Sequence, residues 1–369
     1  MDQKVLYHPG EVNKIREIPG HPHLVVTHTD SPELYVWNTD TQPDRGRAAK
    51  EKSAKAEPSK PDLRLVGHKE DAMFPLATSA AAPFIASGGS DKLVLLWSLE
   101  DSMSKLLAGT AGGANLPARS TLKGHTATVE DVVFKPSSFE QLASVGDDQM
   151  LMLWDTRTGS APVQTVKDAH GKGHDIQCVD WDGHAGNAGN LIATGAADGS
   201  LRIWDVRKLG SNKDAFAVFT GVHTGGIIRL EWHPTERGVF ASGGEDKLIN
   251  VWRVDPDAPQ SQQAQASKDA PPPELMFQHA GHRRGKVVDF QWSPDPGLPW
   301  SMLSVSDDVS EESNEGGGSL QMWRINHLIY GPEDDVVAEL EAQANFVLNG
   351  AAAGDSVPTP NNPTAMATD

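Results

Sequence analysis

Short runs of apolar residues recur along the whole chain, and each run is bounded by glycine, aspartate, serine or proline. Runs such as VEDVVF, IQCVDW, IIRLEW and VVDFQW are rich in β-branched and aromatic residues and are too short for helices. Each is followed by a second run with Ser or Thr near its end, a tight turn, and a third run that ends in Trp. This alternation predicts short strands joined by tight turns, and therefore an all-β fold.

A repeated segment that ends in tryptophan fixes the register of these runs. The segments THTDSPELYVW, SGGSDKLVLLW, SVGDDQMLMLW, TGAADGSLRIW and SGGEDKLINVW each carry Ser or Thr ten residues before the Trp. In the last four, an Asp stands four residues after that Ser or Thr and 23 or 24 residues after a His. A sixth copy pairs His282 with Asp308 and ends at Trp323, and the first copy pairs His8 with Ser31. Six copies in one chain indicate a structural repeat.

The spaced His, Ser or Thr, Asp and Trp predict a buried hydrogen-bond network in each repeat, with the imidazole between the carboxylate and the hydroxyl. The residues predicted to form these networks are His68, Ser87, Asp91, Trp97, His125, Ser144, Asp148, Trp154, His174, Thr194, Asp198, Trp204, His223, Ser242, Asp246 and Trp252. A catalytic triad or a set of metal-ligating histidines is the alternative. Repetition of the same set in each copy favours the structural role, so we predict no catalytic residues and no metal site.

Repeats of 50 to 60 residues with four strands each are typical of a β-propeller, whose signature of Gly-His and Trp-Asp occurs here twice. Six repeats are recognisable, and the propeller is predicted to span 1–330. The predicted repeats cover about 8–39, 67–99, 124–157, 173–207, 222–254 and 281–325. Segments 40–61, 100–120, 255–273 and 309–318 interrupt them and are expected to be exposed, mobile loops. We expect a helix at 332–348 and a disordered tail at 349–369.

Composition excludes several classes of protein. The 32 Lys and Arg against 50 Asp and Glu give a net charge of -18, which disfavours nucleic-acid binding through a basic face. A single cysteine, Cys178, excludes an intramolecular disulfide framework and suggests an intracellular location, and no apolar stretch approaches the length of a membrane span. No phosphate-binding loop, His-Glu-x-x-His, Gly-x-Ser-x-Gly or dinucleotide fingerprint occurs, so we predict no cofactor and no enzymatic activity.

Several segments are more specific than the general repeat. HPGEVNKIREIP, THTDSPELYVWNTDTQPDR, SVGDDQMLMLWDTRTG, FQHAGHRRGKVVDFQWSP and LQMWRINHLIYGPED resemble the histone-binding WD40 repeat proteins of the retinoblastoma-associated and MSI type, most closely the plant FVE-like branch. The resemblance extends from about residue 5 to residue 347. It implies a nuclear, non-catalytic subunit of histone deacetylase, Polycomb repressive or nucleosome-remodelling complexes that binds histone tails and contributes to transcriptional repression.

The resemblance also implies seven blades, whereas six repeats begin at residue 8. The chain is therefore expected to be shortened at its N-terminus relative to the family. We expect an open or imperfectly closed ring in which the first and sixth blades lack their usual neighbour and expose sheet edges.

Two histone sites are implied by the family. The first lies across the top mouth of the propeller, where carboxylates focus an electrostatic field onto Lys and Arg of a peptide. Its residues would be Glu11, Asn13, Asp71, Phe74, Glu130, Asp175, Gln177, Ile228 and Lys286, with Lys14 beside them. The second is a side groove for a histone helix, at Asp269, Pro271, Pro272, Pro273, Glu274, Leu275, Phe277, Leu328, Ile329 and Tyr330. Because the family's N-terminal helix is missing and the acidic run is reduced to Asp269, we expect weak or absent binding there.

The two Trp-Asp-x-Arg sequences suggest a different function. They resemble the box by which some WD40 proteins bind a cullin ubiquitin ligase adaptor as substrate receptors, and Arg157 and Arg207 would make the contacts. Alternatively, Trp-Asp is only the end of the repeat and Arg a common exposed residue after it. Both functions could be present in one protein.

Overall fold

The computed structural model describes residues 4–45, 57–70, 75–184, 189–257, 271–283, 285–307, 318–331 and 333–349. The chain divides into two compact units, Met1–Trp323 and Arg324–Asp369. Within these described ranges, the first unit contains six β-sheets and the second contains two helices.

Successive antiparallel strands form each sheet in chain order, and β8 (Ala114–Pro117) adds to the first sheet as a parallel neighbour of β4 (Leu63–Val66). The first sheet contains β1 (Val12–Ile18), β2 (His21–Thr29), β3 (Leu34–Asn38) and β4 (Leu63–Val66). The second contains β5 (Leu76–Thr78), β6 (Phe84–Gly88), β7 (Leu93–Ser98) and β9 (Ser120–Lys123). The third contains β10 (Val129–Phe134), β11 (Gln141–Gly146), β12 (Leu151–Asp155) and β13 (Gln164–Val166).

The last three sheets repeat this order, and among the described residues the sixth has three strands. The fourth sheet contains β14 (Ile176–Trp181), β15 (Leu191–Ala196), β16 (Leu201–Asp205) and β17 (Ala215–Phe219), with a 3-10 turn at Val206–Lys208. The fifth contains β18 (Ile227–Trp232), β19 (Val239–Gly244), β20 (Ile249–Arg253) and β21 (Leu275–His279). The sixth contains β22 (Val287–Trp292), β23 (Ser301–Ser306) and β24 (Ser319–Arg324).

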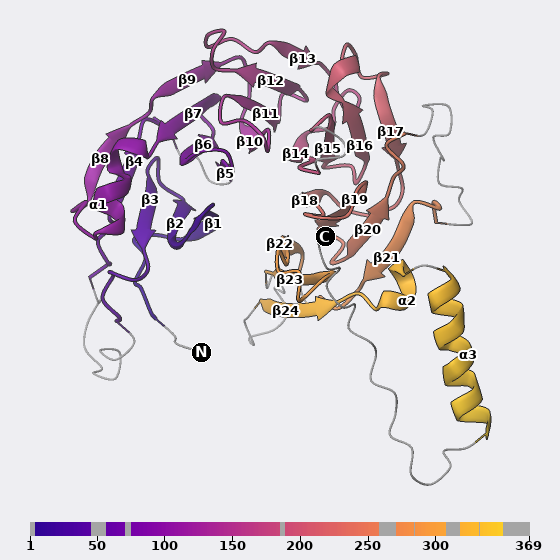
Figure 1. Cartoon of the computed structure of the whole chain (residues 1–369). Helices are drawn as coiled ribbons and strands as arrows, with labels where there is room; N and C mark the ends of the chain where they lie inside the picture. The colour runs from indigo at the N-terminus through magenta and orange to yellow at the C-terminus, as the bar shows by residue number, and fades with distance from the viewer. Residues whose placement is uncertain are drawn as a thin grey trace, which may run out of the picture. The chain divides into compact units, whose positions relative to one another are not determined.

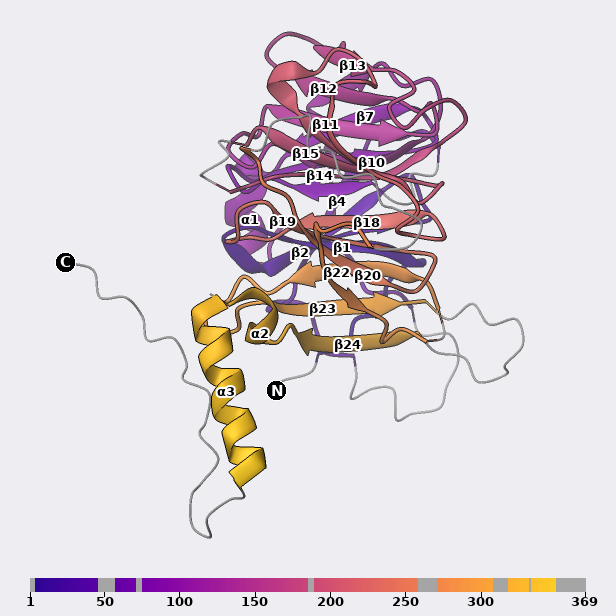
Figure 2. The same ribbon diagram turned by 90° about the vertical axis from the view of Figure 1, so that its right-hand side faces the viewer.

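The six sheets of the first unit are the blades of a β-propeller. The first strand of each sheet faces a common centre, and each of these strands lies beside that of the next sheet, from β1 through β5, β10, β14 and β18 to β22 (Figure 1). Figure 2 shows the strands of successive sheets lying side by side. The predicted all-β propeller with six repeats is therefore confirmed.

The core lies between adjacent sheets, because each sheet covers its apolar faces with its neighbours. Ala143 and Val145 of the third sheet pack in one cluster with Ile176 and Val179 of the fourth. Five of the repeat tryptophans are buried in this way, namely Trp37, Trp97, Trp154, Trp204 and Trp252. Trp323 of the sixth sheet is only half-buried and stacks on His279, with ring centroids 4.1 Å apart.

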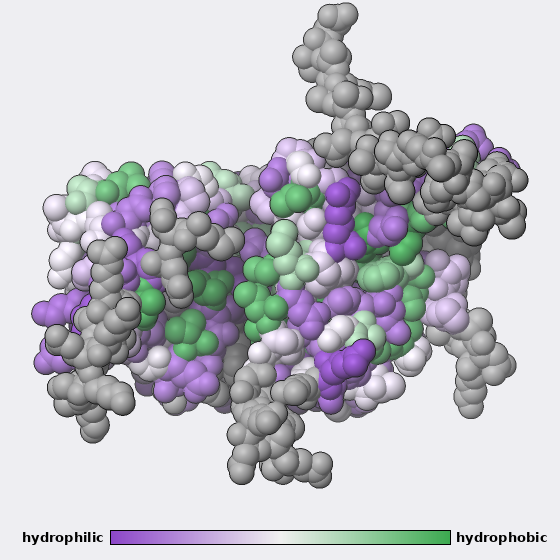
Figure 3. Space-filling view, turned by 90° about the horizontal axis from the view of Figure 1, so that it is seen from below, coloured by the Kyte–Doolittle hydropathy of each residue, from purple (hydrophilic) through white to green (hydrophobic). Residues whose placement is uncertain are grey.

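Apolar side chains are exposed on the first and sixth sheets, where each lacks a neighbour on one side. Leu320 and Met322 of β24 are 68% and 67% exposed, and Ile15 of β1 is 51% exposed. In the view from below, hydrophobic residues form several patches on this side (Figure 3). These side chains show that apolar faces of the two blades are exposed, and the expectation of exposed strand edges stays a prediction.

The segment 100–120 was predicted to be an exposed, mobile loop, but it contains helical turns and a strand. It contains η2 (Glu100–Ser102), α1 (Met103–Leu107) and β8 (Ala114–Pro117), which pairs in parallel with β4. Leu106 is fully buried in the core, and its carbonyl accepts a hydrogen bond of 2.8 Å from the Asn38 side chain. This apolar anchor and the added strand hold the segment against the first sheet.

The other predicted loops and the tail fall partly outside the described residues. Residues 46–56, 258–270, 308–317 and 350–369 are not described. Where 40–61 is described, Gln42 is buried and donates a 2.9 Å hydrogen bond to Asp62, so this part is fixed to the sheet.

The second unit begins with α2 (His327–Tyr330) and continues with α3 (Glu333–Asn349), which lies where a helix was expected. The Asn326 side chain caps α2 by accepting a 3.0 Å hydrogen bond from the Leu328 N–H. His327 and Glu339 bond to each other and so connect the two helices. Across the described residues, no helix combines the length and apolar character that a membrane crossing requires.

Candidate functional site

Buried hydrogen-bond networks fix one end of each blade. In the third sheet, His125 lies 2.9 Å from Asp148 and 2.7 Å from the Ser144 hydroxyl, which also accepts a 2.8 Å bond from Trp154. Burial alone would raise the pKa of Asp148, but the bonds from His125 and backbone N–H groups hold it below its ordinary value. His223, Ser242, Asp246 and Trp252 form the same network in the fifth sheet.

The second sheet differs in one contact. His68 bonds to Asp91 at 3.0 Å and to Ser87 at 3.2 Å, as predicted. The indole N–H of Trp97, however, donates to the Val66 carbonyl at 3.2 Å instead of to Ser87. The Ser87 hydroxyl lies 3.4 Å from a ring nitrogen of His28 of the first sheet.

In the fourth sheet, the network histidine is His170, and the assignment of His174 was wrong. The two ring nitrogens of His170 lie 2.7 Å from the hydroxyls of Ser200 and Thr194. The His174 side chain is 43% exposed and lies 3.6 Å from Asp198. Burial lowers the pKa of His170 to about 3, so its ring is neutral and suited to two hydroxyl partners. Thr194 still accepts the indole bond from Trp204, at 2.8 Å.

The first and sixth sheets use partial networks. His8 lies 2.8 Å from Thr27, which accepts a 2.9 Å bond from Trp37, while Ser31 bonds to Thr29. His282 lies 2.7 Å from Ser304 and 2.9 Å from Ser319, and Asp308 lies outside the described residues.

A cluster of carboxylates lies at the network end of the third and fourth sheets. Glu130 follows the first residue of β10, Asp147 follows β11 beside it, and Asp175 directly precedes β14. Burial raises the pKa of Glu130 to about 7, and the negative charges of Asp147, Asp131 and Asp175 add to this. Burial and the charge of Asp175 also raise the pKa of Asp147. We refer to Glu130, Asp147 and Asp175 as the acid cluster.

Three cations pair with carboxylates on the central strands. Lys14 of β1 bonds to Asp131 of β10 at 3.0 Å. Arg16 of β1 bonds to Asp289 of β22 at 2.7 Å, and Arg229 of β18 lies 3.1 Å from the same carboxylate. Burial would raise the pKa of Asp289, but the two guanidinium groups lower it to about 2. The first strand is thus linked to both the third and the sixth sheet.

Acids on these central strands also connect neighbouring blades. Asp131 accepts a 3.1 Å bond from the Val179 N–H, and Asp180 accepts a 2.7 Å bond from the Trp232 N–H. Glu231 accepts from the N–H of Trp292 at 3.3 Å. Burial raises the pKa of Asp180 to about 6 and that of Glu231 to about 8. Each acid therefore satisfies a backbone donor of the next sheet.

Comparison with known proteins shows the family to which this chain belongs. The model of the WD domain, G-beta repeat, matches residues 117–155, 161–205 and 217–253. The WD-40 repeat-containing protein MSI4 of Arabidopsis thaliana is 43% identical over 363 residues, which cover 94% of this chain and 68% of the relative. The chain belongs to the MSI family of WD40-repeat proteins.

Only some of the residues predicted at the propeller mouth of this MSI-family protein lie in the acid cluster. Glu130 and Asp175 lie in the acid cluster, and the Gln177 side chain points toward Gly226 of the next blade. Glu11 is exposed, Asn13 and Ile228 are half-buried, and Lys286 lies 3.9 Å from Asp307. Asp71 and Phe74 lie outside the described residues.

Asp147 is a member of the acid cluster that the sequence analysis missed. It directly precedes the network residue Asp148 in the turn after β11, and Glu245 precedes Asp246 in the same way. The recurrence of an acid directly before the network Asp could have predicted this member of the cluster. In the third and fifth sheets, this turn therefore carries a second carboxylate beside that of the network Asp.

The predicted side groove divides between the two units. Pro272 is buried and its carbonyl accepts a 3.0 Å bond from Leu275 at the start of β21, while Pro271 and Pro273 are exposed. Glu274 and Phe277 are half-buried in the same unit. Leu328, Ile329 and Tyr330 belong to α2 in the second unit, and Asp269 lies outside the described residues. Weak histone-helix binding at this groove stays a prediction.

The two candidate ligase-docking arginines contact their own repeats. The Arg157 guanidinium lies 2.8 Å from Asp155, and that of Arg207 lies 2.9 Å from Asp205. Their side chains are 58% and 63% exposed. Both guanidinium groups therefore stabilise the turn that follows the Trp-Asp pair, and nothing in this geometry favours ligase docking over that role. No group of His, Cys, Asp and Glu in the described chain could hold a metal ion.

Proposed function

We propose that this MSI-family protein is a non-catalytic adaptor that binds basic histone tails at the mouth of its propeller. The supporting observation is the acid cluster of Glu130, Asp147 and Asp175. None of the three forms an ion pair with another described residue, although they lie close enough for their charges to raise the pKa of Glu130 and of Asp147. A lysine or arginine side chain from a bound peptide would relieve this repulsion, because a cation stabilises the ionised carboxylates.

The positions of the His, Ser and Asp side chains support the adaptor role. The His, Ser and Asp sets that resemble catalytic triads are buried within blades, where each imidazole is held by its own hydroxyl and acid partners. A chain of this family would contribute binding surfaces to a complex and leave the chemistry to other subunits. We propose histone deacetylase, Polycomb repressive and remodelling complexes in the nucleus as its setting, with repression of transcription as the outcome.

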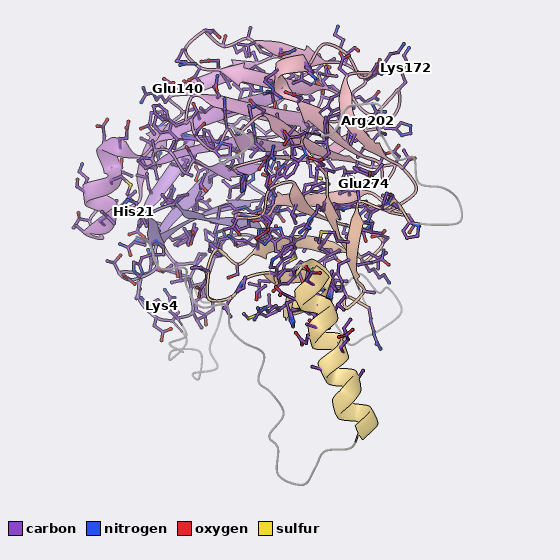
Figure 4. The ribbon with its side chains drawn as sticks, turned by 45° about the vertical axis from the view of Figure 1, so that its right-hand side comes forward. Lys4, His21, Glu140, Lys172, Arg202 and Glu274 are labelled. Carbon is purple, nitrogen blue, oxygen red and sulfur yellow. The ribbon has the colours of Figure 1, made fainter. Side chains whose placement is uncertain are left out.

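The test is binding of a fluorescent histone-three tail peptide, measured by anisotropy at physiological salt. We expect saturable binding that weakens at least about tenfold in Glu130→Gln. The matched control is Glu140→Gln, because Glu140 lies at the opposite end of the same β10–β11 pair and is labelled at the periphery in Figure 4. A folded Glu130→Gln variant that binds the peptide as tightly as the unaltered protein would contradict the proposal.

A further inference from the structure

A pocket of about 490 Å³ opens at the second sheet and is lined by three lysines from separate segments. Lys69 follows β4, Lys92 lies in the turn between β6 and β7, and Lys123 is the last residue of β9. We call this site the lysine pocket. It lies at the end of the sheet where His68 binds Asp91, which corresponds to the end that carries the acid cluster in the third sheet.

The three ammonium groups are available to a ligand. All three lysines are exposed, and none forms an ion pair with another described residue. Three unpaired cations around one pocket stand out in a chain whose net charge is -18. The hydroxyls of Ser90 and Thr121 line the same pocket and add hydrogen-bonding groups.

The repeat itself does not require lysine at these positions. After the network His and after the turn Asp, the third sheet carries Thr126 and Gln149, where the second carries Lys69 and Lys92. Lys92 and Gln149 both have a φ of 65°, so the turn accepts an uncharged side chain without a change of backbone. The fifth sheet carries Thr224 and Lys247 at these positions, so the second sheet differs from the third and the fifth in having lysine at both.

Two acids also line the pocket, and they differ in their effect. The carboxylate of Asp91 is occupied, because it bonds to His68 at 3.0 Å and to the N–H groups of Lys69 and Leu93 at 3.2 Å. Glu70 is exposed and opposes an anionic ligand. The five charged side chains leave a formal charge of +1, which suits one small dianion and not an extended polyanion.

We propose that the lysine pocket binds the phosphate group of a phosphorylated serine or threonine in a protein partner. A phosphate monoester carries close to two negative charges and three strong acceptor oxygens, and lysine ammonium groups are common phosphate ligands. Nucleic acid is disfavoured, because its neighbouring phosphates would meet Glu70 and a chain whose net charge is -18. The choice of a peptide over a free ion rests on the proposed function, which makes this end of the blades a protein-binding face.

The test uses a labelled phosphoserine peptide with neutral flanking residues, its unphosphorylated form, and inorganic phosphate as a competitor. We expect anisotropy to detect only the phosphorylated peptide, and binding to weaken at least about tenfold in the triple variant Lys69→Gln, Lys92→Gln, Lys123→Gln. Glu70→Gln is expected to tighten binding, because it removes the opposing charge. Lys247→Gln is the matched control, because Lys247 occupies the same turn position of the fifth sheet with a φ of 68°.

Equal affinity in the triple variant, or no binding by a protein that melts cooperatively, would overturn the proposal. Binding of inorganic phosphate in a direct calorimetric titration, without any binding of the phosphopeptide, would overturn the assignment to a protein partner. The neutral flanks separate this site from the acid cluster, since Glu130→Gln should leave phosphopeptide binding unchanged. Failure of histone-tail binding would therefore not affect this result.

Discussion

Both ring nitrogens of the buried His170 have hydroxyl partners, whereas the exposed His174 makes only a long contact with Asp198. The two histidines are four positions apart, and the residues next to them do not show which one is buried. The spacing held a signal, because His174 lies 20 residues before Thr194 while His68, His125 and His223 lie 19 before their serines. Buried polar groups without partners are costly, so packing selects the histidine that both hydroxyls can reach.

Replacing His170 with alanine should destabilise the protein, while the same change at His174 should not. We expect His170→Ala to lower the free energy of unfolding by about 2–4 kcal/mol, because it leaves a cavity and two unpaired hydroxyls. His174→Ala should change it by less than about 0.5 kcal/mol. Urea denaturation followed by circular dichroism measures both, and equal losses would contradict the reassignment.

Histone-tail binding should depend on pH near neutrality. The pKa of Glu130 in the free protein is raised to about 7, and a bound cation favours the ionised carboxylate. As the pH falls through 7, the free protein takes up a proton that must be lost on binding, so affinity should fall. Anisotropy titrations between about pH 6 and 8 should show this decrease, and Glu130→Gln should flatten it. A flat profile in the unaltered protein would exclude Glu130 from the binding site.

At the scale of elements, the sequence repeat predicted the strands of the blades. It did not predict the helix α1 in the segment 100–120. The spacings between His, Asp and Trp located the blades, because these residues recur at similar positions in most of the sheets. Successive side chains along a strand point to opposite faces of its sheet, and adjacent blades cover these faces. The segment 100–120 has no such repeat, and its glycines and alanines mask a single anchor, Leu106. Its pairing with β4 depends on a parallel contact that no local pattern encodes.

Leu106→Ala should therefore act as a core mutation. We expect a loss of about 2–4 kcal/mol in the free energy of unfolding, because the side chain is fully buried among residues of the first two sheets. Leu107→Ala, one position along, is the control, since Leu107 is 51% exposed. Thermal or urea denaturation distinguishes the two, and similar small effects would restore the loop interpretation.

At the scale of the whole propeller, ion pairs cross the centre between strands far apart in the chain. Arg16 and Asp289 are 273 residues apart, and no repeat pattern could have paired them. The acid cluster was predicted in part, because the family resemblance located Glu130 and Asp175 but not Asp147. The blades could thus be predicted from the spacing of residues in the sequence. The contacts between blades could be identified only from the folded structure.

Removing the Asp289 carboxylate should loosen the link between the first and sixth sheets. Asp289→Asn leaves Arg16 and Arg229 without their shared partner, so we expect a loss of about 2–4 kcal/mol in stability. Hydrogen exchange should speed up most in β1 and β22. Asp295→Asn in an exposed turn of the same sheet is the control, and unchanged exchange in β1 would show that the pair does not hold the two sheets together.

The half-buried Trp323 has an optical consequence. The chain contains ten tryptophans, and the other nine are at most 5% exposed. A polar quencher such as iodide therefore reaches one indole in ten, and that indole lies on the outermost strand of the sixth sheet. Anything that covers β24 will remove the quenchable part of the native fluorescence, so the protein carries its own reporter for that edge.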